Sequence, residues 1–250
     1  MLFKQLLEAD SCTYTYLIGC EETRRAILID PVLDTAERDL QVLKDMGLIL
    51  MATLETHVHA DHLTSARRLK QRTECQIAYP RMLDLPCADI GVQEGEPLRV
   101  GSVTLHPLFT PGHTDHHHAY LIDTPVQKLL FTGDALLIEA CGRTDFQSGS
   151  ATDLYNSIHN KLFSLPGETL VYPGHDYEQR FVSSIAQEKA RNPRLGGGRS
   201  TDDIVALLDG LHLPYPRMTD FAVPGNAHCC QCPAKVPPQF RGPCASIDQG

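Results

Sequence analysis

The feature that most constrains this chain is a cluster of metal-capable side chains directly after an apolar run. The run "LILMATLE" is followed by "THVHADHLT", which contains His57, His59, Asp61 and His62. A short apolar run predicts a buried strand, and "LTSARRLKQR" after the cluster predicts a helix. The cluster therefore falls at the carboxyl end of a strand, which is the edge where layered α/β structures bind ligands.

Three further metal-capable residues follow apolar runs in the same way. They are His113 in "FTPGHTD", Asp134 in "LLFTGDALL" and His175 in "LVYPGHDY", and a glycine directly precedes each of them. Such a position lets a side chain leave a sheet and point into a shared pocket. Imidazoles and carboxylates are common ligands of zinc and iron, so the repeated pattern predicts a metal site.

The composition argues against several classes of function. A chain of 250 residues can bury one large core without disulfides or structural metals. Its net charge of −9 disfavours nucleic acid as a partner, and no apolar run approaches the roughly 20 residues that span a bilayer. Nine cysteines show no disulfide-framework spacing, and the first residues lack the pattern of a signal peptide. We therefore expect a cytoplasmic protein without nucleic-acid or membrane partners. A homodimer is compatible with the sequence.

The order of apolar and amphipathic segments predicts an α/β protein with two sheets packed together and helices outside. We expect strands at 3–8, 13–19, 25–30, 48–56, 76–80, 97–100, 103–111, 118–124, 128–134 and 169–175, and helices at 34–46, 63–72 and 153–162. The expected helix at 34–46 has Asp34 as its cap and Gly47 as its stop. One catalytic domain spans 1–228 and includes a helical part at 178–212, with irregular chain from Pro214 onwards. Residues 229–250 form a cysteine- and proline-rich tail, flexible or docked.

Beyond the metal motif, longer segments resemble a known family. "HVHADH" together with His113, Asp134 and His175 is similar to the metallo-β-lactamase superfamily, which implies an αββα sandwich with a metal site at one edge of the two sheets. "CGRTDFQ", "YPGHDY", "NPRL" and "LPYPRMTDFAVPGN" resemble the glutathione persulfide dioxygenases, also called sulfur dioxygenases, and the likeness spans about residues 10 to 228. The resemblance implies an enzyme that oxidises the sulfane sulfur of glutathione persulfide with O₂ to sulfite and glutathione.

The same resemblance implies a single iron(II) per chain, with His57, His113 and Asp134 as its ligands and as the catalytic centre. Two imidazoles and one carboxylate leave coordination positions open for substrate and O₂. The other metal-capable residues would then orient these ligands or hold a second metal; they are His59, Asp61, His62 and His175.

Substrate contacts also follow from the resemblance. It places Tyr177 and Arg194 against the glutathione tripeptide and Arg143 near the iron, and arginine suits the tripeptide's carboxylates. Arg143 has a structural alternative, in which it is buried against Asp145 or another carboxylate. Cys141 is expected to be an inert buried thiol, unless a low thiol pKa lets it exchange sulfur.

Two other functions fit the ligand set. All seven ligands of a two-metal hydrolase are present, which allows a dinuclear zinc enzyme of the glyoxalase II type that cleaves glutathione thioesters. A domain that only binds metal or thiols is the lesser alternative. "CGRTDFQ" and the late "PRMTDFAVPGN" segment favour the dioxygenase.

The remaining histidines and cysteines carry weaker signals. His116, His117 and His118 cannot all point to one site from a strand, so we expect most of them to be solvated. We expect ordinary surface or hydrogen-bonded roles for His106, His159 and His212. The spacing of the late cluster does not match a zinc ribbon; it comprises His228, Cys229, Cys230, Cys232 and Cys244.

Overall fold

A computed structural model describes residues 1–211, 213–215 and 217–228 of the chain. The described residues divide into two compact units. Unit 1 comprises Met1–Val92, Arg99–Val103 and residues 214–228, and unit 2 comprises Gln93–Leu98 and Thr104–Leu213. Among the described residues, no helix has both the length and the apolar character that crossing a membrane requires.

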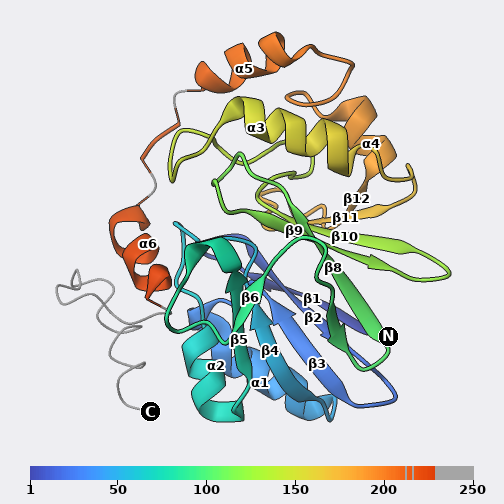
Figure 1. Cartoon of the computed structure of the whole chain (residues 1–250), viewed down its shortest axis with the longest axis vertical. Helices are drawn as coiled ribbons and strands as arrows, with labels where there is room; N and C mark the ends of the chain where they lie inside the picture. Colours follow the sequence, from blue (N-terminus) through green and yellow to red (C-terminus); the bar gives the residue numbers. More distant parts are fainter. Residues whose placement is uncertain (212, 216, 229–250) are drawn as a thin grey trace. The chain divides into compact units, whose positions relative to one another are not determined.

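Unit 1 is built on a six-stranded mixed sheet (Figure 1). Its strands, in spatial and chain order, are β1 (Leu2–Glu8), β2 (Thr13–Gly19), β3 (Arg25–Ile29), β4 (Ile49–Leu54), β5 (Gln76–Pro80) and β6 (Ile90–Val92). The first three pair antiparallel, and β3 to β6 pair parallel. The carboxyl ends of β3 and β4 therefore share one edge, which brings the residues after them close together.

The two helices expected in unit 1, at 34–46 and 63–72, are present, with one change at the start of the first. The helical segments of this unit are η1 (Leu33–Thr35), α1 (Ala36–Asp45), α2 (Ala66–Thr73), η2 (Arg81–Leu83) and α6 (Thr219–Ala227). Gly47 ends α1 as predicted, with φ of 60°. The predicted cap at Asp34 is wrong, because the 3₁₀ turn η1 comes first and Thr35 takes the N-cap position without a side-chain bond. Both α1 and α2 pack against β4, over a core that includes Leu17, Leu28, Leu43 and Leu69.

The expectation of irregular chain from Pro214 is wrong at α6. The prolines around residues 214–224 indicated a broken chain, yet α6 continues through Pro224. Phe221, Ala222 and Asn226 of this helix are buried. Helices in proteins gain most of their stability from packing rather than from propensity, so the buried face of α6 outweighs the cost of its proline.

Unit 2 contains most of the second mixed sheet, whose strand order is β12-β11-β10-β9-β8-β7; residues 99–100 of β7 and Val103 of β8 fall in unit 1. Its strands are β7 (Leu98–Val100), β8 (Val103–Phe109), β9 (His118–Asp123), β10 (Lys128–Gly133), β11 (Leu170–Pro173) and β12 (Ser183–Ser184). The central strands β10 and β11 pair parallel, so their carboxyl ends also meet at one edge. Asp134 follows β10 directly, and His175 lies two residues after β11.

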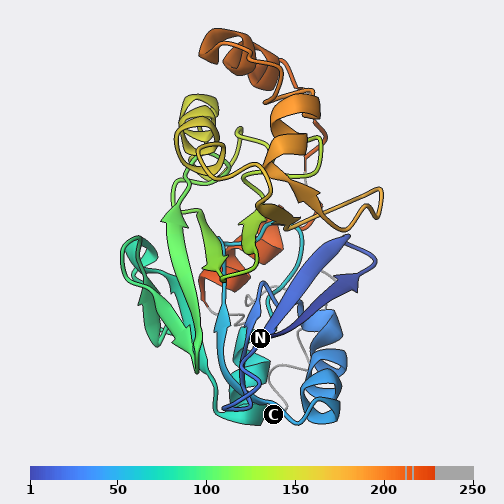
Figure 2. The ribbon, with the colours of Figure 1, turned by 90° about the vertical axis from the view of Figure 1, so that its right-hand side faces the viewer.

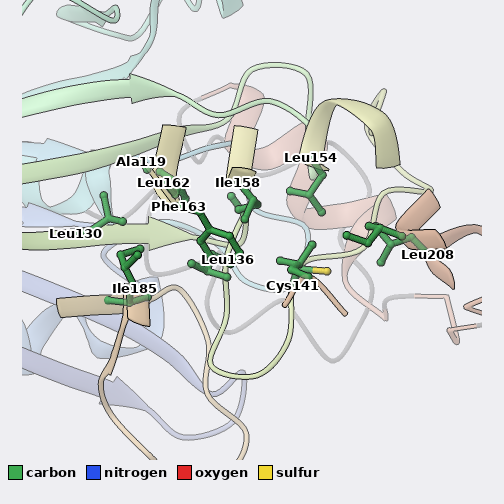
Figure 3. Close-up of a cluster of buried hydrophobic side chains, with 14 of the residues drawn as sticks. Ala119, Leu130, Leu136, Cys141, Leu154, Ile158, Leu162, Phe163, Ile185 and Leu208 are labelled. Atoms are coloured by element: carbon green, nitrogen blue, oxygen red, sulfur yellow. The ribbon is translucent and has the colours of Figure 1, made fainter. Parts of the chain in front are cut away.

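Helical segments of unit 2 are α3 (Ala151–Asn156), which continues as a π-helical turn at Ser157–Leu162, α4 (Ile185–Arg191) and α5 (Thr201–Asp209) (Figures 1 and 2). Serine caps each start: Ser150, Ser184 and Ser200 accept hydrogen bonds from backbone N–H groups of the first turns. An apolar cluster, which includes Leu130, Leu154, Ile158 and Ile185, joins the sheet to these helices (Figure 3). The predicted helix at 153–162 is confirmed, and the short strands β6 and β12 were not predicted.

Candidate metal centre

The loop after β4 gathers the predicted histidines of unit 1 in a buried stack. The rings of His57 and His59 lie 4.2 Å apart, and those of His59 and His62 lie 4.3 Å apart. Ligand atoms of His59, Asp61 and His62 lie within 4.8 Å of one another. Unit 1 therefore presents several metal-capable atoms at one point, as the spacing in "HVHADH" predicts.

Neighbouring side chains fix the tautomer of His57. The Thr56 backbone N–H donates to Asp30 Oδ1 (2.7 Å), and the Thr56 hydroxyl donates to Asp30 Oδ2 (2.8 Å). Because that hydroxyl proton is used on Asp30, Thr56 Oγ1 accepts from His57 Nδ1 at 2.9 Å. The proton of the neutral ring then lies on Nδ1, and Nε2 keeps the lone pair that a metal requires.

Two buried carboxylates hold His59. Its Nε2 lies 3.1 Å from Asp30 Oδ1 and 3.3 Å from Glu55 Oε2. Burial opposes a charge on the ring, but the two carboxylates outweigh it and raise the pKa of His59 well above its ordinary value. Burial also raises the pKa of the Glu55 carboxyl, although the contacts with His59 work against that effect.

Two ring nitrogens of unit 1 fit a metal. His59 Nδ1 and His62 Nε2 are buried and have no hydrogen-bond partner within the described part of the chain. The other nitrogen of His62 lies 2.9 Å from Asp61 Oδ2, so the ring is oriented from that side. Buried polar atoms are rarely left without a partner, and an unpaired imidazole nitrogen is the atom that ligates a metal.

Unit 2 orients His113 through the backbone of the "CGRTDFQ" segment. His113 Nδ1 donates to the Arg143 carbonyl at 2.7 Å, since a carbonyl can only accept. Its Nε2 then keeps a lone pair and lies 3.6 Å from Asp134 Oδ2. Gly142 permits this approach, because a Cβ there would lie 2.3 Å from the Asp134 carbonyl oxygen and 2.7 Å from His113 Nδ1. The segment thus acts on the site through its backbone.

Asp134 lies between two imidazoles of unit 2. His175 Nε2 is 3.5 Å from Asp134 Oδ1, whereas His113 contacts the other carboxylate oxygen, Oδ2. Oδ1 is buried and accepts no hydrogen bond from the described residues. Gly174 leaves it room, because a Cβ at that position would come within 2.4 Å of Oδ1. His113, Asp134 and His175 are therefore gathered as the sequence pattern predicts, and their donor set suits a transition metal.

The expectation that most of His116–His118 would be solvated is wrong. The exposed fractions are 5% for His116, 0% for His117 and 3% for His118. β9 begins only at His118, so the three residues lie on a turn and a strand start rather than along an exposed strand. His118 Nδ1 bonds the His116 carbonyl at 2.9 Å. His117 instead contacts Asp134, which gives it a structural role beside a predicted ligand.

Comparison with known proteins identifies the family. The metallo-beta-lactamase superfamily matches residues 13–175. A mouse protein named persulfide dioxygenase ETHE1, mitochondrial, is 45% identical over 230 residues, which cover 92% of this chain and 89% of the mouse protein. The crystal structure of ETHE1 from Myxococcus xanthus superposes with a TM-score of 0.88 at 47% identity, over 92% of this chain and all of that one. The chain belongs to the persulfide dioxygenase family.

Membership of this family confirms the predicted fold class. Two mixed sheets with helices are the metallo-β-lactamase fold, and the Myxococcus structure shares it. A probable hydroxyacylglutathione hydrolase from Schizosaccharomyces pombe is less similar, with 34% identity over 184 residues, which cover 72% of this chain and 71% of that protein. A metal cofactor fits both the fold and the buried ligand clusters.

Among the predicted substrate contacts of this persulfide dioxygenase family member, Arg143 forms an ion pair within the protein. Its Nε and Nη2 donate to the two carboxylate oxygens of Asp145 at 2.6 and 2.7 Å, and its guanidinium lies 4.2 Å from the Phe146 ring centre. The hydrogen bond from Arg143 lowers the pKa of Asp145. The ion pair that the sequence left as an alternative is therefore present.

The other two predicted contacts of the family member lie elsewhere in unit 2. Tyr177 is 71% exposed, and its ring lies parallel to that of His175 with 5.9 Å between centroids. Arg194 is half-buried, and its Nη1 donates to the Cys141 carbonyl at 2.8 Å. The exposed Tyr177 ring is accessible to a ligand, whereas Arg194 also supports the backbone of the "CGRTDFQ" segment.

Cys141 itself is part of the core. Its sulfur lies among Leu136, Leu154 and Leu208 (Figure 3). Burial raises the pKa of the Cys141 thiol to about 11, and the nearby Arg194 offsets this only in part. A thiol with this pKa is protonated at neutral pH, which argues against the alternative in which Cys141 exchanges sulfur.

Sequence reasoning missed the residues that orient the ligands. Asp30 follows β3 just as the predicted ligands follow their strands, so the same rule applied to "AILIDP" would have found it. Glu55 and Thr56 directly precede His57, but nothing in their type marked them. The Arg143 carbonyl carries no side-chain signal at all, because a backbone atom makes the contact.

Proposed function

We propose that the chain is an iron(II)-dependent persulfide dioxygenase that converts glutathione persulfide to sulfite and glutathione. The observation that carries the proposal is the 45% identity to the mouse persulfide dioxygenase over 92% of the chain. The reaction balances with water: persulfide, O₂ and H₂O give glutathione and sulfurous acid. The terminal sulfur loses four electrons and O₂ gains four, while the thiol of glutathione takes the proton of the persulfide.

In this proposal His57, His113 and Asp134 hold one iron per chain. Bound iron(II) supplies the redox chemistry that O₂ requires, which redox-inert zinc cannot supply. The chain contributes the ligand geometry. Thr56 holds His57 through Nδ1, and the Arg143 carbonyl holds His113 through Nδ1. In the neutral form of each ring the proton then lies on Nδ1 and Nε2 carries the lone pair, which is the tautomer that ligates a metal through Nε2.

The surrounding residues keep the proposed ligands in place without binding the iron themselves. His59 is held by Asp30 and Glu55, and His175 lies beside Asp134. Groups of this kind typically change metal affinity or activity by ~10–100-fold when they are removed. We assign His59, Asp61, His62 and His175 to this supporting role.

For the substrate, we propose that Arg143, Tyr177 and Arg194 contact glutathione persulfide. The tripeptide carries two carboxylates, which arginine binds with paired hydrogen bonds. Arg143 belongs to the "CGRTDFQ" segment, whose backbone orients His113, and Arg194 donates to the Cys141 carbonyl of the same segment. Such contacts would hold the tripeptide while its terminal sulfur reaches the metal.

A dinuclear zinc hydrolase of the glyoxalase II type is the second candidate. The buried, unpaired His59 Nδ1 and His62 Nε2 favour it, because a second metal would bind both of them. The S. pombe relative, a probable hydroxyacylglutathione hydrolase, shares 34% identity with this chain. A domain that binds metal or thiols without catalysis is the lesser candidate, and the full set of proposed ligands disfavours it.

Metal analysis of protein purified without oxygen separates these candidates. We expect about one iron per chain for the dioxygenase, and about two zinc ions would instead support the hydrolase. We further propose a cytoplasmic location and small-molecule partners alone. A homodimer is compatible with this proposal. The assignment of 1–228 as one catalytic domain stays a prediction, and the tail at 229–250 lies outside the described residues.

A further inference from the structure

The C-terminal helix α6 contributes one side chain to the loop that carries the histidines of unit 1. Asn226 is fully buried, and its carboxamide makes three hydrogen bonds to backbone groups of that loop. Nδ2 donates to the carbonyls of His59 (2.9 Å) and His62 (2.8 Å), and Oδ1 accepts from the Thr64 N–H (3.0 Å). More than 160 residues of sequence separate Asn226 from the groups it binds.

These bonds require an amide in one orientation. Exchanging oxygen and nitrogen would set Nδ2 against the N–H of Thr64 and Oδ1 against two carbonyl oxygens. Aspartate has the same shape but cannot donate, so it would face the carbonyls of His59 and His62 with a repelling oxygen. Position 226 therefore selects asparagine by hydrogen-bonding chemistry as well as by size.

Backbone bonds secure the far end of the loop. Leu33 N–H donates to the Leu63 carbonyl, and Ser65 N–H donates to the Pro31 carbonyl, each within 2.9 Å. Asn226 binds the stretch between the histidines, on either side of Asp61. Without its carboxamide, the carbonyls of His59 and His62 would be buried without these partners, and the loop would gain conformational freedom.

We infer that Asn226 is a positioning residue of the metal site, whose carboxamide fixes the backbone of the His57–Thr64 loop and thereby strengthens metal binding. The inference rests on the proposed function, in which His57 ligates the metal. Without the carboxamide the loop is less ordered in the metal-free protein. Metal binding must then order the loop again, which lowers the metal affinity. The late "PGN" segment then acts on the metal site through this contact of Asn226.

Packing and hydrogen bonding by α6 can be separated. Val223 packs against an apolar cluster that includes Val58, Ala66 and Ile77, and it makes no part of the amide contacts. A Val223→Ala variant weakens the docking of α6 and keeps Asn226. An Asn226→Asp variant keeps the shape of the side chain and removes both donated bonds, and Asn226→Ser removes the amide without adding charge.

The first measurement is an anaerobic titration of the metal-free full-length protein with Co²⁺ alone, in which the visible absorption of the bound ion reports binding. The second is thermal unfolding of the metal-free protein. We expect Asn226→Asp and Asn226→Ser to raise the Kd by roughly 10- to 100-fold and to change the absorption spectrum. Val223→Ala should lower the melting temperature while its Kd stays within about twofold of wild type.

The outcomes distinguish this inference from the proposed function. A wild-type protein that binds no Co²⁺ or Fe²⁺ contradicts the metal site itself. A wild type that binds while both Asn226 variants bind equally well overturns the role of Asn226. Equal increases in Kd for Val223→Ala and the Asn226 variants also overturn it, because helix docking rather than the carboxamide would then set the affinity.

Discussion

His117 accepts a hydrogen bond from the backbone N–H of Asp134 through its Nε2, at 3.2 Å. The tautomer follows from this contact: Nδ1 must carry the ring proton, and it donates that proton to Thr110 Oγ1 at 2.9 Å. The neutral ring of His117 therefore connects the end of β8 to the residue after β10. It fixes the backbone of a proposed ligand from inside unit 2, where the ring is fully buried.

Replacing His117 with alanine should leave the Asp134 N–H buried without this partner. We expect a loss of roughly 1–3 kcal/mol in the free energy of unfolding of the metal-free protein, together with weaker metal binding. Chemical denaturation and metal titration measure the two effects. His106→Ala on the exposed face of β8 is the matched control and should change neither. A His117→Ala protein as stable as this control would refute the assigned contact.

Substitution of individual ligands tests the mononuclear assignment. His113→Ala or Asp134→Ala removes a proposed ligand, so bound iron and oxygen uptake should fall together. His62→Ala should keep most of the iron and lower the rate or the substrate affinity by ~10–100-fold. Elemental analysis of each purified variant gives the metal content. If His62→Ala instead loses one of two bound metals, the site is dinuclear and the assignment is wrong.

Arg194 separates substrate binding from chemistry. A buried bond between arginine and a substrate carboxylate is worth ~1.5–3 kcal/mol, so Arg194→Ala should raise KM for glutathione persulfide by roughly 10- to 150-fold and leave kcat nearly unchanged. Arg194→Lys should recover only part of the affinity, because an ammonium lacks the planar pair of donors. Steady-state kinetics at several salt concentrations provide the measurement. A lysine variant equal to wild type at every salt concentration would show that Arg194 makes no paired contact with a substrate carboxylate.

Asp39 on α1 gives a pH-dependent prediction. Burial raises the pKa of its carboxyl from 3.8 to about 6 in the folded protein, and Arg38 opposes this only in part. An acid with a raised folded pKa stabilises the fold below its unfolded pKa, and this contribution disappears as pH rises through the folded pKa. Relative to Asp39→Asn, wild type should therefore lose about 3 kcal/mol of unfolding free energy between pH 3.5 and 7.

Denaturant titrations of both proteins across this pH range measure the difference directly. Comparing the two proteins cancels the titration of groups that they share. A difference that is constant with pH, or one that grows in favour of wild type as pH rises, would contradict the raised pKa of Asp39.

The sequence predicted those parts of the site that depend on strand ends. His57, His113, Asp134 and His175 each follow an apolar run, and the structure places each of them one to four residues after the end of a strand. The alternation of strand side chains and the parallel pairing of β10 with β11 make such positions meet. This is why the residues gathered within each unit could be anticipated.

Contacts between distant segments could not be predicted in this way. Asn226 binds the loop of His59 and His62 across more than 160 residues, and its surroundings suggested irregular chain. Most of His116–His118 were expected to be solvated, because a run of three alternates faces along a strand, yet the turn before β9 buries His117. Local pattern determines which element a residue joins, whereas packing determines what its side chain contacts.

The most direct test of the account is the simultaneous measurement of O₂ and sulfite. Iron-loaded protein, supplied with glutathione persulfide under reducing conditions, should consume one O₂ for each sulfite formed, and Asp134→Ala should abolish both signals. The same preparation should show little hydrolysis of S-lactoylglutathione. Faster cleavage of that thioester with no uptake of O₂ would contradict the dioxygenase and establish the hydrolase instead.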